Sequence, residues 1–356
     1  TSALGGNYMV ERRPELENWQ PYGAVKPVPA NLRNYLMMLD VMEGKGPIYM
    51  QTAEAIQKIA ASETDPKEAK KKLKELEAEA WEDFLDMTIS QAILWAATNI
   101  QPEESPSEIA AAEPYFIGSH SGASGAWVSG PEDLAPPEYF WGYEQMTTTK
   151  GLFAAGDASG ASSHKFSSGS HAEGRIAGKS AVRFCVKESG GVNYDESQIA
   201  ALKERVLRPL KIYKDNQDKS TQADVNPAYI LPRSFMQRMQ KLMDEYAGGV
   251  TAQFTTSKPN LERALELLDL LREDSEFLAA SSLHELMRCW ENVHRSYQAE
   301  AHVRAMLFRE ETRWPGYYFR SDMPKMDPKW EVFVNGSFDS ASGDWTFKKV
   351  PIKKIF

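Results

Sequence analysis

The stretch 151–181 constrains the fold most, because it joins a short apolar run, an acid and the start of a helix. Gly151–Asp157 is an apolar run that ends in a glycine and an acid, which is typical of a buried strand. At such a strand end Gly156 lets a ligand approach the backbone closely, and Asp157 offers a carboxylate that accepts hydrogen bonds from hydroxyl groups. The small residues Ser167–Ser170 then precede a helix whose free N–H groups and dipole favour a negatively charged group. The stretch therefore predicts a ligand site between a strand end and a helix start.

Two glycines, Gly174 and Gly178, lie four residues apart in the expected helix. Glycine costs a helix interior about 1 kcal/mol relative to alanine, so this spacing predicts close contact with a sheet or a cofactor along one helix face. A strand that ends in Gly-Asp and a capped helix also occur in many folds without a ligand, where the serines are ordinary N-caps. The order and spacing of the parts favour a cofactor site, and the purely structural interpretation stays open beside it.

Helices are predicted on the N-terminal side of this stretch. One covers 52–61, and a second begins at Asp65, which can cap it, with Pro66 at the first helical position. No helix breaker follows until past Asn99. The mixed-sign charges of Lys67–Glu79 are interpreted as the solvated face of this second helix.

The remaining segments are predicted as follows. Residues 101–113 are rich in Pro, Glu, Ser and Ala and have the composition of a linker. From Ser197 onward the pattern is helical, and the last long helix is expected over Asp274–Glu310. The apolar segments 330–334 and 345–347 flank a turn rich in Gly, Ser and Asp, which predicts a hairpin.

Composition excludes several classes of function. With 41 basic and 50 acidic residues the net charge is −9, which leaves no general basic surface for nucleic acid or anionic lipid. The two cysteines, Cys185 and Cys289, cannot supply the roughly four ligands of an iron–sulfur cluster or a structural zinc, so no metal site is expected. No apolar run reaches the roughly 20 residues that a membrane span requires. The chain begins at Thr1 rather than Met and is expected to be a fragment of a longer chain.

Several motifs resemble a known family. Gly151–Asp157 followed by Gly174–Gly178 resembles the second flavin-binding segment of the succinate dehydrogenase and fumarate reductase flavoproteins. Beyond that superfamily, four stretches resemble the alpha subunits of the dissimilatory adenylylsulfate (APS) reductases: Gly46–Met50, Glu113–Gly122, Ala161–Phe166 and Thr312–Tyr318. The second of these stretches is the most specific, and the resemblance covers essentially the whole chain.

The resemblance implies a fold and a division into domains. Chains of this family are longer, and their Gly-x-Gly-x-x-Gly fingerprint does not occur here, so the chain is similar to the C-terminal part of the family. The implied fold class is α+β, with three parts: a capping-domain segment over 1–112, the C-terminal segment of an FAD-binding domain over 113–208, and a helical C-terminal domain with a terminal hairpin over 209–356.

The resemblance also assigns residues to the cofactor. Asp157, next to Gly156, matches the position whose carboxylate holds the ribityl hydroxyls of the flavin. Ser167, Ser168 and Ser170 match the turn whose N–H groups approach the pyrimidine end of the isoalloxazine. A helix dipole at that place stabilises the anionic reduced flavin.

Two further residues are implied to meet the substrate. His120 matches the superfamily's substrate-site histidine, and its expected role is to donate a hydrogen bond or a positive charge to sulfite or sulfate oxygens. The alternative for His120 is a loop histidine satisfied by backbone groups. Arg33 falls in the segment that resembles the cap over the flavin, where an arginine can pair with the nucleotide phosphate of the substrate. A plain surface arginine is an equal alternative for Arg33.

The implied activity is the reversible, FAD-dependent two-electron reduction of adenylylsulfate to sulfite and AMP in dissimilatory sulfur metabolism. FAD is expected to be bound non-covalently, with [4Fe–4S] clusters only on a partner beta subunit and the complex in the cytoplasm. A dicarboxylate oxidoreductase of the fumarate reductase type is one alternative, although its His-x-Met-Gly-Gly loop and Asn-Arg-Leu-Gly turn are absent. A non-catalytic helical module that binds another subunit is the other alternative.

Overall fold

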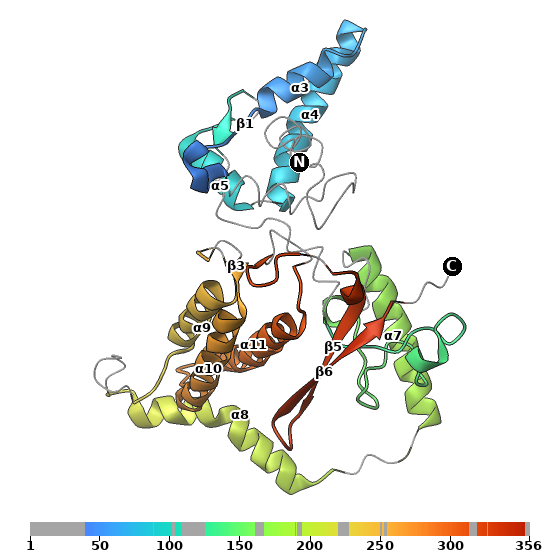
Figure 1. Cartoon of the computed structure of the whole chain (residues 1–356), viewed down its shortest axis with the longest axis vertical. Coiled ribbons are helices and arrows are strands. Elements are labelled where there is room, and N and C mark those ends of the chain that lie inside the picture. Colours follow the sequence, from blue (N-terminus) through green and yellow to red (C-terminus); the bar gives the residue numbers. More distant parts are fainter. Residues whose placement is uncertain are drawn as a thin grey trace. The chain divides into compact units, whose positions relative to one another are not determined.

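The computed structural model describes residues 40–87, 89–101, 104–108, 125–160, 167–188, 190, 194–219, 228–249, 251–252, 255–312, 319–325 and 327–352. These residues fall into two compact units. Unit 1 gathers the described residues of Thr1–Phe116, Gly248–Ser257 and Glu311–Met326, and unit 2 gathers those of Ile117–Ala247, Lys258–Glu310 and Asp327–Phe356. Helices and short strands occur together, as the α+β expectation requires, and Figure 1 labels them.

Unit 1 contains three consecutive helices, α3 (Thr52–Ala60), α4 (Pro66–Met87) and α5 (Ile89–Thr98). Helix α3 confirms the predicted helix over 52–61 to within one residue. The predicted cap is also confirmed, because the Asp65 carboxylate accepts a hydrogen bond from the Lys67 N–H at 2.8 Å. The charged side chains described at the start of α4 are exposed, as expected of a solvated face.

The helix predicted from Asp65 with no breaker until past Asn99 corresponds to α4 and α5, which lie on either side of Thr88, a residue outside the described ones. Helix α5 ends before Asn99, whose φ of 55° is left-handed and ends the helix as asparagine often does. Trp95 of α5 is fully buried, and the N–H of Ile100 returns to its carbonyl at 2.9 Å.

Two short ladders complete unit 1. Strand β1 (Tyr49–Met50) pairs antiparallel with β2 (Ser107–Glu108), and β3 (Thr255–Thr256) pairs parallel with β4 (Phe319–Arg320). Arg320 is 1% exposed, and its guanidinium binds both carboxylate oxygens of Asp322, at 2.9 and 2.6 Å. A bidentate bond of this kind satisfies most of the charge of a buried arginine.

Unit 2 is built around helices α8 (Glu196–Asn216), α9 (Pro232–Tyr246), α10 (Lys258–Asp274) and α11 (Leu283–Phe308). Helices α9, α10 and α11 pack against one another and lie side by side in Figure 1. Their contact faces carry apolar residues at helical spacing that are essentially inaccessible to water: Phe235, Leu261, Ala264, Leu268 and Val303. The buried Asn292 side chain of α11 donates to the carbonyl of Pro232 at 2.7 Å, which joins α11 to the start of α9.

The last long helix begins later than predicted. The prediction started it at Asp274, but Ser275–Phe277 is a 3₁₀ turn, and α11 begins at Leu283. Between them the chain is extended, because the N–H of Ala279 bonds to the carbonyl of Ile230 at 2.9 Å. Ser282 then caps α11 by accepting from the N–H of Glu285.

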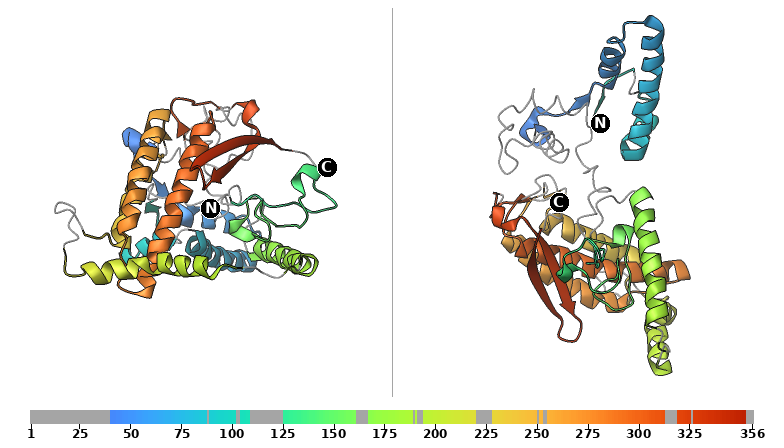
Figure 2. Two further views of the ribbon diagram at one scale, coloured as in Figure 1. Left: turned by 90° about the horizontal axis from the view of Figure 1, so that it is seen from below. Right: turned by 90° about the vertical axis from the view of Figure 1, so that its right-hand side faces the viewer.

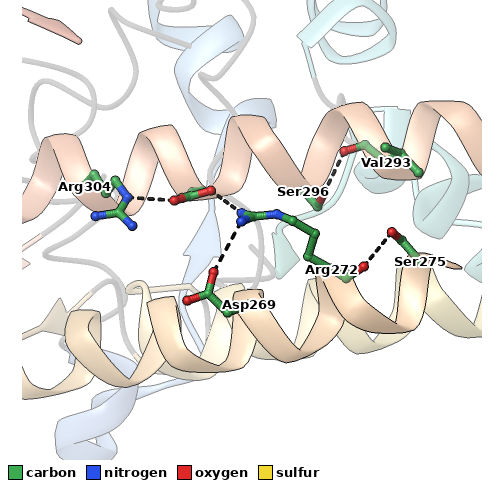
Figure 3. A network of polar contacts seen from close by, with 7 residues as sticks. Asp269, Arg272, Ser275, Val293, Ser296 and Arg304 are labelled. Atoms are coloured by element: carbon green, nitrogen blue, oxygen red, sulfur yellow. Dashed lines mark hydrogen bonds and ion pairs between the residues drawn. The ribbon is translucent and has the colours of Figure 1, made fainter. Parts of the chain in front are cut away.

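A charged network crosses between α10 and α11 (Figure 3). The Glu300 side chain is only 4% exposed and pairs with Arg272 of α10 and, at 2.7 Å, with Arg304 of its own helix. Arg272 also reaches Asp269 at 3.3 Å, and its guanidinium lies 5.1 Å from the centre of the Tyr297 ring. The buried carboxylate therefore has two cationic partners, as a buried charge requires.

The C-terminal hairpin is confirmed. Strand β5 (Val332–Asp339) pairs antiparallel with β6 (Asp344–Pro351), and Gly343 in the turn adopts a φ of 77°. Aromatic contacts fix the hairpin beside α11, since Phe308 stacks on Phe347 with ring centres 5.6 Å apart. Figure 2 shows the hairpin, in dark red, next to the orange helix.

Candidate functional site

The turn Gly156–Ala158, called the Gly156 turn below, lies against the start of α7 (Ser167–Lys187). Gly156 is buried and has a φ of 62°, a conformation that glycine adopts without strain. A Cβ at this position would lie 3.2 Å from the Ser170 hydroxyl oxygen, so the close approach of turn and helix also requires a glycine. The Glu173 carboxylate accepts a hydrogen bond from the Gly156 N–H at 2.7 Å.

The other side of the turn is held by a second segment. The N–H of Ala126 donates to the Ala158 carbonyl at 2.8 Å, and the N–H of Gly160 donates to the Ala126 carbonyl at 2.9 Å. A Cβ on Gly125 would lie 2.6 Å from the backbone nitrogen of Gly160. The two backbones touch directly, and Ser159 between them is fully buried. The turn is thus fixed from both sides.

The predicted cofactor residues that the structure describes gather at this place. Asp157 follows Gly156 and is exposed, while Ser168 and Ser170 occupy the first turn of α7. Ser167 is the first residue of the helix. The exposed Asp157 carboxylate, the exposed Ser168 hydroxyl and the N–H groups of a helix start provide polar groups suited to hydroxyl and carbonyl groups of a ligand. His120 and Arg33 lie outside the described residues.

The strand predicted at Gly151–Asp157 is wrong for the described structure. Phe153 makes only an isolated antiparallel bridge to Met146, Leu152 is 56% exposed, and the run ends in the 3₁₀ turn. A buried strand requires neighbours that accept its whole ladder of hydrogen bonds. Among the described residues this segment forms one isolated bridge instead, so the apolar run is an extended loop.

The close packing predicted at Gly174 and Gly178 is absent from the described part of the chain. Both glycines are exposed, and no atom lies within 4 Å of a Cβ built on either. Helix α7 uses another face, on which Ala177 and Ser180 are buried. Phe184 on that face packs edge-on against Tyr143, with ring centres 5.3 Å apart.

A second acidic residue, just beyond the end of α7, binds the same loop at its far end. Glu188, which directly follows the helix, pairs with Lys150 at 2.7 Å and accepts from the Tyr143 hydroxyl at 3.4 Å. The hydrogen bond and the charge of Lys150 lower the pKa of Glu188, and the same contacts raise the pKa of Lys150. All three groups are at the surface, so this cluster is a solvent-exposed ion pair and hydrogen bond that connect the loop to the end of α7.

Sequence reasoning missed Glu173. The signal available was weak, namely an acid near a helix start, where the dipole favours negative charge. Its partner Gly156 is 17 residues away, and that contact depends on the tertiary fold.

Among the described residues there is neither a candidate metal site nor a candidate membrane span. They hold no group of three or more His, Cys, Asp or Glu side chains arranged to bind a metal ion. In the same residues, no helix combines the length and apolarity needed to cross a membrane.

No protein-family model matches the chain. The adenylylsulfate reductase subunit alpha of Megalodesulfovibrio gigas is 44% identical over 365 residues, which cover 100% of this chain and 54% of that protein. Two solved structures match at 53% identity and a TM-score of 0.86, over 98% of this chain and 54% of theirs. They are adenylylsulfate reductase from the hyperthermophilic Archaeoglobus fulgidus and adenosine-5-phosphosulfate reductase in complex with sulfite as a covalent adduct.

A quinol-fumarate reductase matches 92% of this chain and 49% of its own at 16% identity and a TM-score of 0.58, which is a likeness of fold alone. The chain spans about half the length of the adenylylsulfate reductases that it matches. Over its whole length, the chain is homologous to the alpha subunit of adenylylsulfate reductase, as its motifs predicted.

Proposed function

We propose that the chain supplies the C-terminal half of the flavin-binding subunit of an adenylylsulfate reductase. The activity is the reversible two-electron reduction of adenylylsulfate to sulfite and AMP, in the cytoplasm. Identity of 44% and 53% to adenylylsulfate reductases over nearly the whole chain supports this choice of substrate. The division into a capping segment over 1–112, an FAD-binding segment over 113–208 and a helical domain over 209–356 is part of the same proposal.

One observation carries the proposal: the Gly156 turn packs on the start of α7. This contact brings a carboxylate and a helix N-terminus to one place, although Ser167 lies ten positions after Asp157 in the chain. This combination of groups suits a cofactor that carries hydroxyl groups and a ring system that gains negative charge on reduction.

The residues present fit FAD. Asp157 would accept hydrogen bonds from the ribityl hydroxyls, because its carboxylate is exposed beside a rigid turn. The N–H groups of Ser167, Ser168 and Ser170 would face the pyrimidine end of the flavin, where the helix dipole favours added negative charge. When bound, FAD supplies the two-electron chemistry that side chains lack.

Two residues outside the described part are proposed to bind the substrate. His120 would donate a hydrogen bond to the sulfur-bound oxygens and so stabilise the negative charge that develops on them. It lies five positions before Gly125, which contacts the Gly156 turn. Arg33 would pair with the nucleotide phosphate, for which the fork of a guanidinium is well suited.

Electrons are proposed to come from a beta subunit that carries [4Fe–4S] clusters. Cys289 is buried and Cys185 is exposed and remote in sequence, so these two thiols do not form a cluster site. The two thiols described here are therefore consistent with clusters held by the beta subunit.

The test uses the full-length gene product, purified with its partner subunit. We expect stoichiometric FAD, and AMP and sulfite formed from adenylylsulfate with a reduced dye as electron donor. The His120→Ala variant should retain FAD but lose about 100-fold in turnover, the usual cost of removing one donor to a developing oxyanion. Fumarate reduction without turnover of adenylylsulfate would favour the dicarboxylate alternative, and absence of FAD binding at micromolar FAD would favour the non-catalytic module.

A further inference from the structure

We propose that Glu173 is a positioning residue for the cofactor: it holds the Gly156 turn in place so that Asp157 presents its carboxylate to FAD. The inference rests on the proposed function, and it adds a residue that would act on the cofactor through the Gly156 turn. Its basis is the hydrogen bond of 2.7 Å from the Gly156 N–H to the Glu173 carboxylate.

This hydrogen bond is of a strong type. The acceptor is a carboxylate, and hydrogen bonds to ionised acceptors are roughly twice as strong as neutral ones. Glu173 is half-buried, so water competes only partly for its oxygens. The donor belongs to a buried glycine whose N–H would otherwise be unsatisfied.

Glu173 and Ser170 act on the same turn from one helix face. They are three residues apart in α7, and residues at this spacing are neighbours on a helix surface. The Ser170 side chain packs so closely on Gly156 that a Cβ added to the glycine would touch the serine hydroxyl. The Glu173 carboxylate accepts a hydrogen bond from the N–H of Gly156. The peptide plane of Gly156 is therefore fixed both by contact and by hydrogen bonding.

The fixed plane determines where Asp157 points. Asp157 is the middle residue of the turn, which the Ser159 N–H closes on the Gly156 carbonyl at 3.0 Å. The turn is too short to absorb a change at Gly156, so loss of the Glu173 bond would move the Asp157 backbone. Fixing a ligand-binding carboxylate before the ligand arrives reduces the entropy lost on binding.

Helix α7 offers a matched control in Glu188. It too ties α7 to the preceding loop, through Lys150, but it lies 15 residues further on, about 22 Å along a helix axis. Removing Glu188 therefore shows the effect of losing an acidic side chain that connects the helix to the loop at a position remote from the Gly156 turn.

The experiment measures FAD dissociation constants of the full-length gene product by flavin fluorescence, for wild type, Glu173→Ala, Glu173→Gln and Glu188→Ala. We expect Glu173→Ala to weaken FAD binding by about tenfold, since a hydrogen bond to a charged group is lost. Glu173→Gln should restore part of the affinity, because its amide oxygen accepts the same N–H in a weaker, uncharged hydrogen bond. Glu188→Ala should bind FAD as wild type does. Hydrogen exchange of the peptide that contains Gly156, read by mass spectrometry without FAD, should be faster in Glu173→Ala alone.

The outcomes separate this inference from the proposed function. A wild-type protein that binds no FAD would overturn both. Wild-type affinity in Glu173→Ala, or unchanged exchange at Gly156, would overturn the positioning role and leave the flavin site standing. Equal weakening in Glu173→Gln and Glu173→Ala would also overturn it, since the charge rather than the acceptor geometry would then matter.

Discussion

Replacing Gly156 and Gly178 by alanine should change stability in opposite directions. The two substitutions add the same methyl group within one region of unit 2. Gly156 has a φ of 62°, where a side chain costs about 1–2 kcal/mol through contact of Cβ with the following carbonyl. Its Cβ would also lie 3.2 Å from the Ser170 hydroxyl, tight enough that this side chain must move. Together these effects predict a loss of about 2 kcal/mol in the free energy of unfolding.

Gly178 lies in an open part of a helix. No atom is within 4 Å of its added Cβ, so only the backbone term remains. Alanine restricts the unfolded chain and favours the helix, which predicts a gain of about 0.5–1 kcal/mol. The pair thus differs by about 3 kcal/mol, although the chemical change is identical.

Urea unfolding of the purified variants, followed by tryptophan fluorescence and circular dichroism, measures both effects as shifts in the transition midpoint. Gly174→Ala serves as a second open-helix control and should behave like Gly178→Ala, because its Cβ also meets nothing. A Gly156→Ala protein as stable as wild type would refute the argument from the left-handed turn. Destabilisation by Gly178→Ala would show that this face of α7 is packed against another part of the protein.

Three further outcomes are expected. Glu300→Ala removes a buried carboxylate and should lower the free energy of unfolding by about 3 kcal/mol, because Arg272 and Arg304 lose their shared partner between α10 and α11. Urea unfolding measures this loss. The pKa of Glu188 should lie below the ordinary glutamate value and return to it in Lys150→Met, which NMR titration would detect. Because the pKa is lowered in the folded protein, the ion pair between Glu188 and Lys150 is present at neutral pH and is lost as the pH falls through that pKa. Burial raises the pKa of Cys289 to about 12, so a thiol reagent at pH 8 should label only the exposed Cys185 in the native protein and both cysteines in denaturant. Rapid labelling of both cysteines in the native protein would contradict this.

Features set by neighbouring residues could be predicted from the sequence. The Asp65 cap depends on a side chain two positions from its donor, and the C-terminal hairpin depends on a turn that contains Gly343. Both are decided within a few residues, so composition and spacing suffice.

Features set by distant residues could not be predicted. The start of α11 was wrong because the segment before it pairs with Ile230, nearly fifty residues earlier, and nothing local breaks the helical pattern. Gly151–Asp157 has the composition of a strand, but strand formation depends on the neighbours available to pair with it. The contact of Glu173 with Gly156 is likewise tertiary, so the acid had no distinguishing feature in the sequence.

The affinity of the full-length gene product for FAD, compared between wild type and Asp157→Ala, tests the flavin site most directly. If the Gly156 turn and the start of α7 hold the cofactor, losing this carboxylate removes charge-assisted hydrogen bonds to the ribityl hydroxyls, and the dissociation constant should rise by at least about tenfold. The unfolding temperature of each protein without FAD serves as the control for the fold itself. Equal affinity in the two proteins would contradict the account and place the cofactor elsewhere.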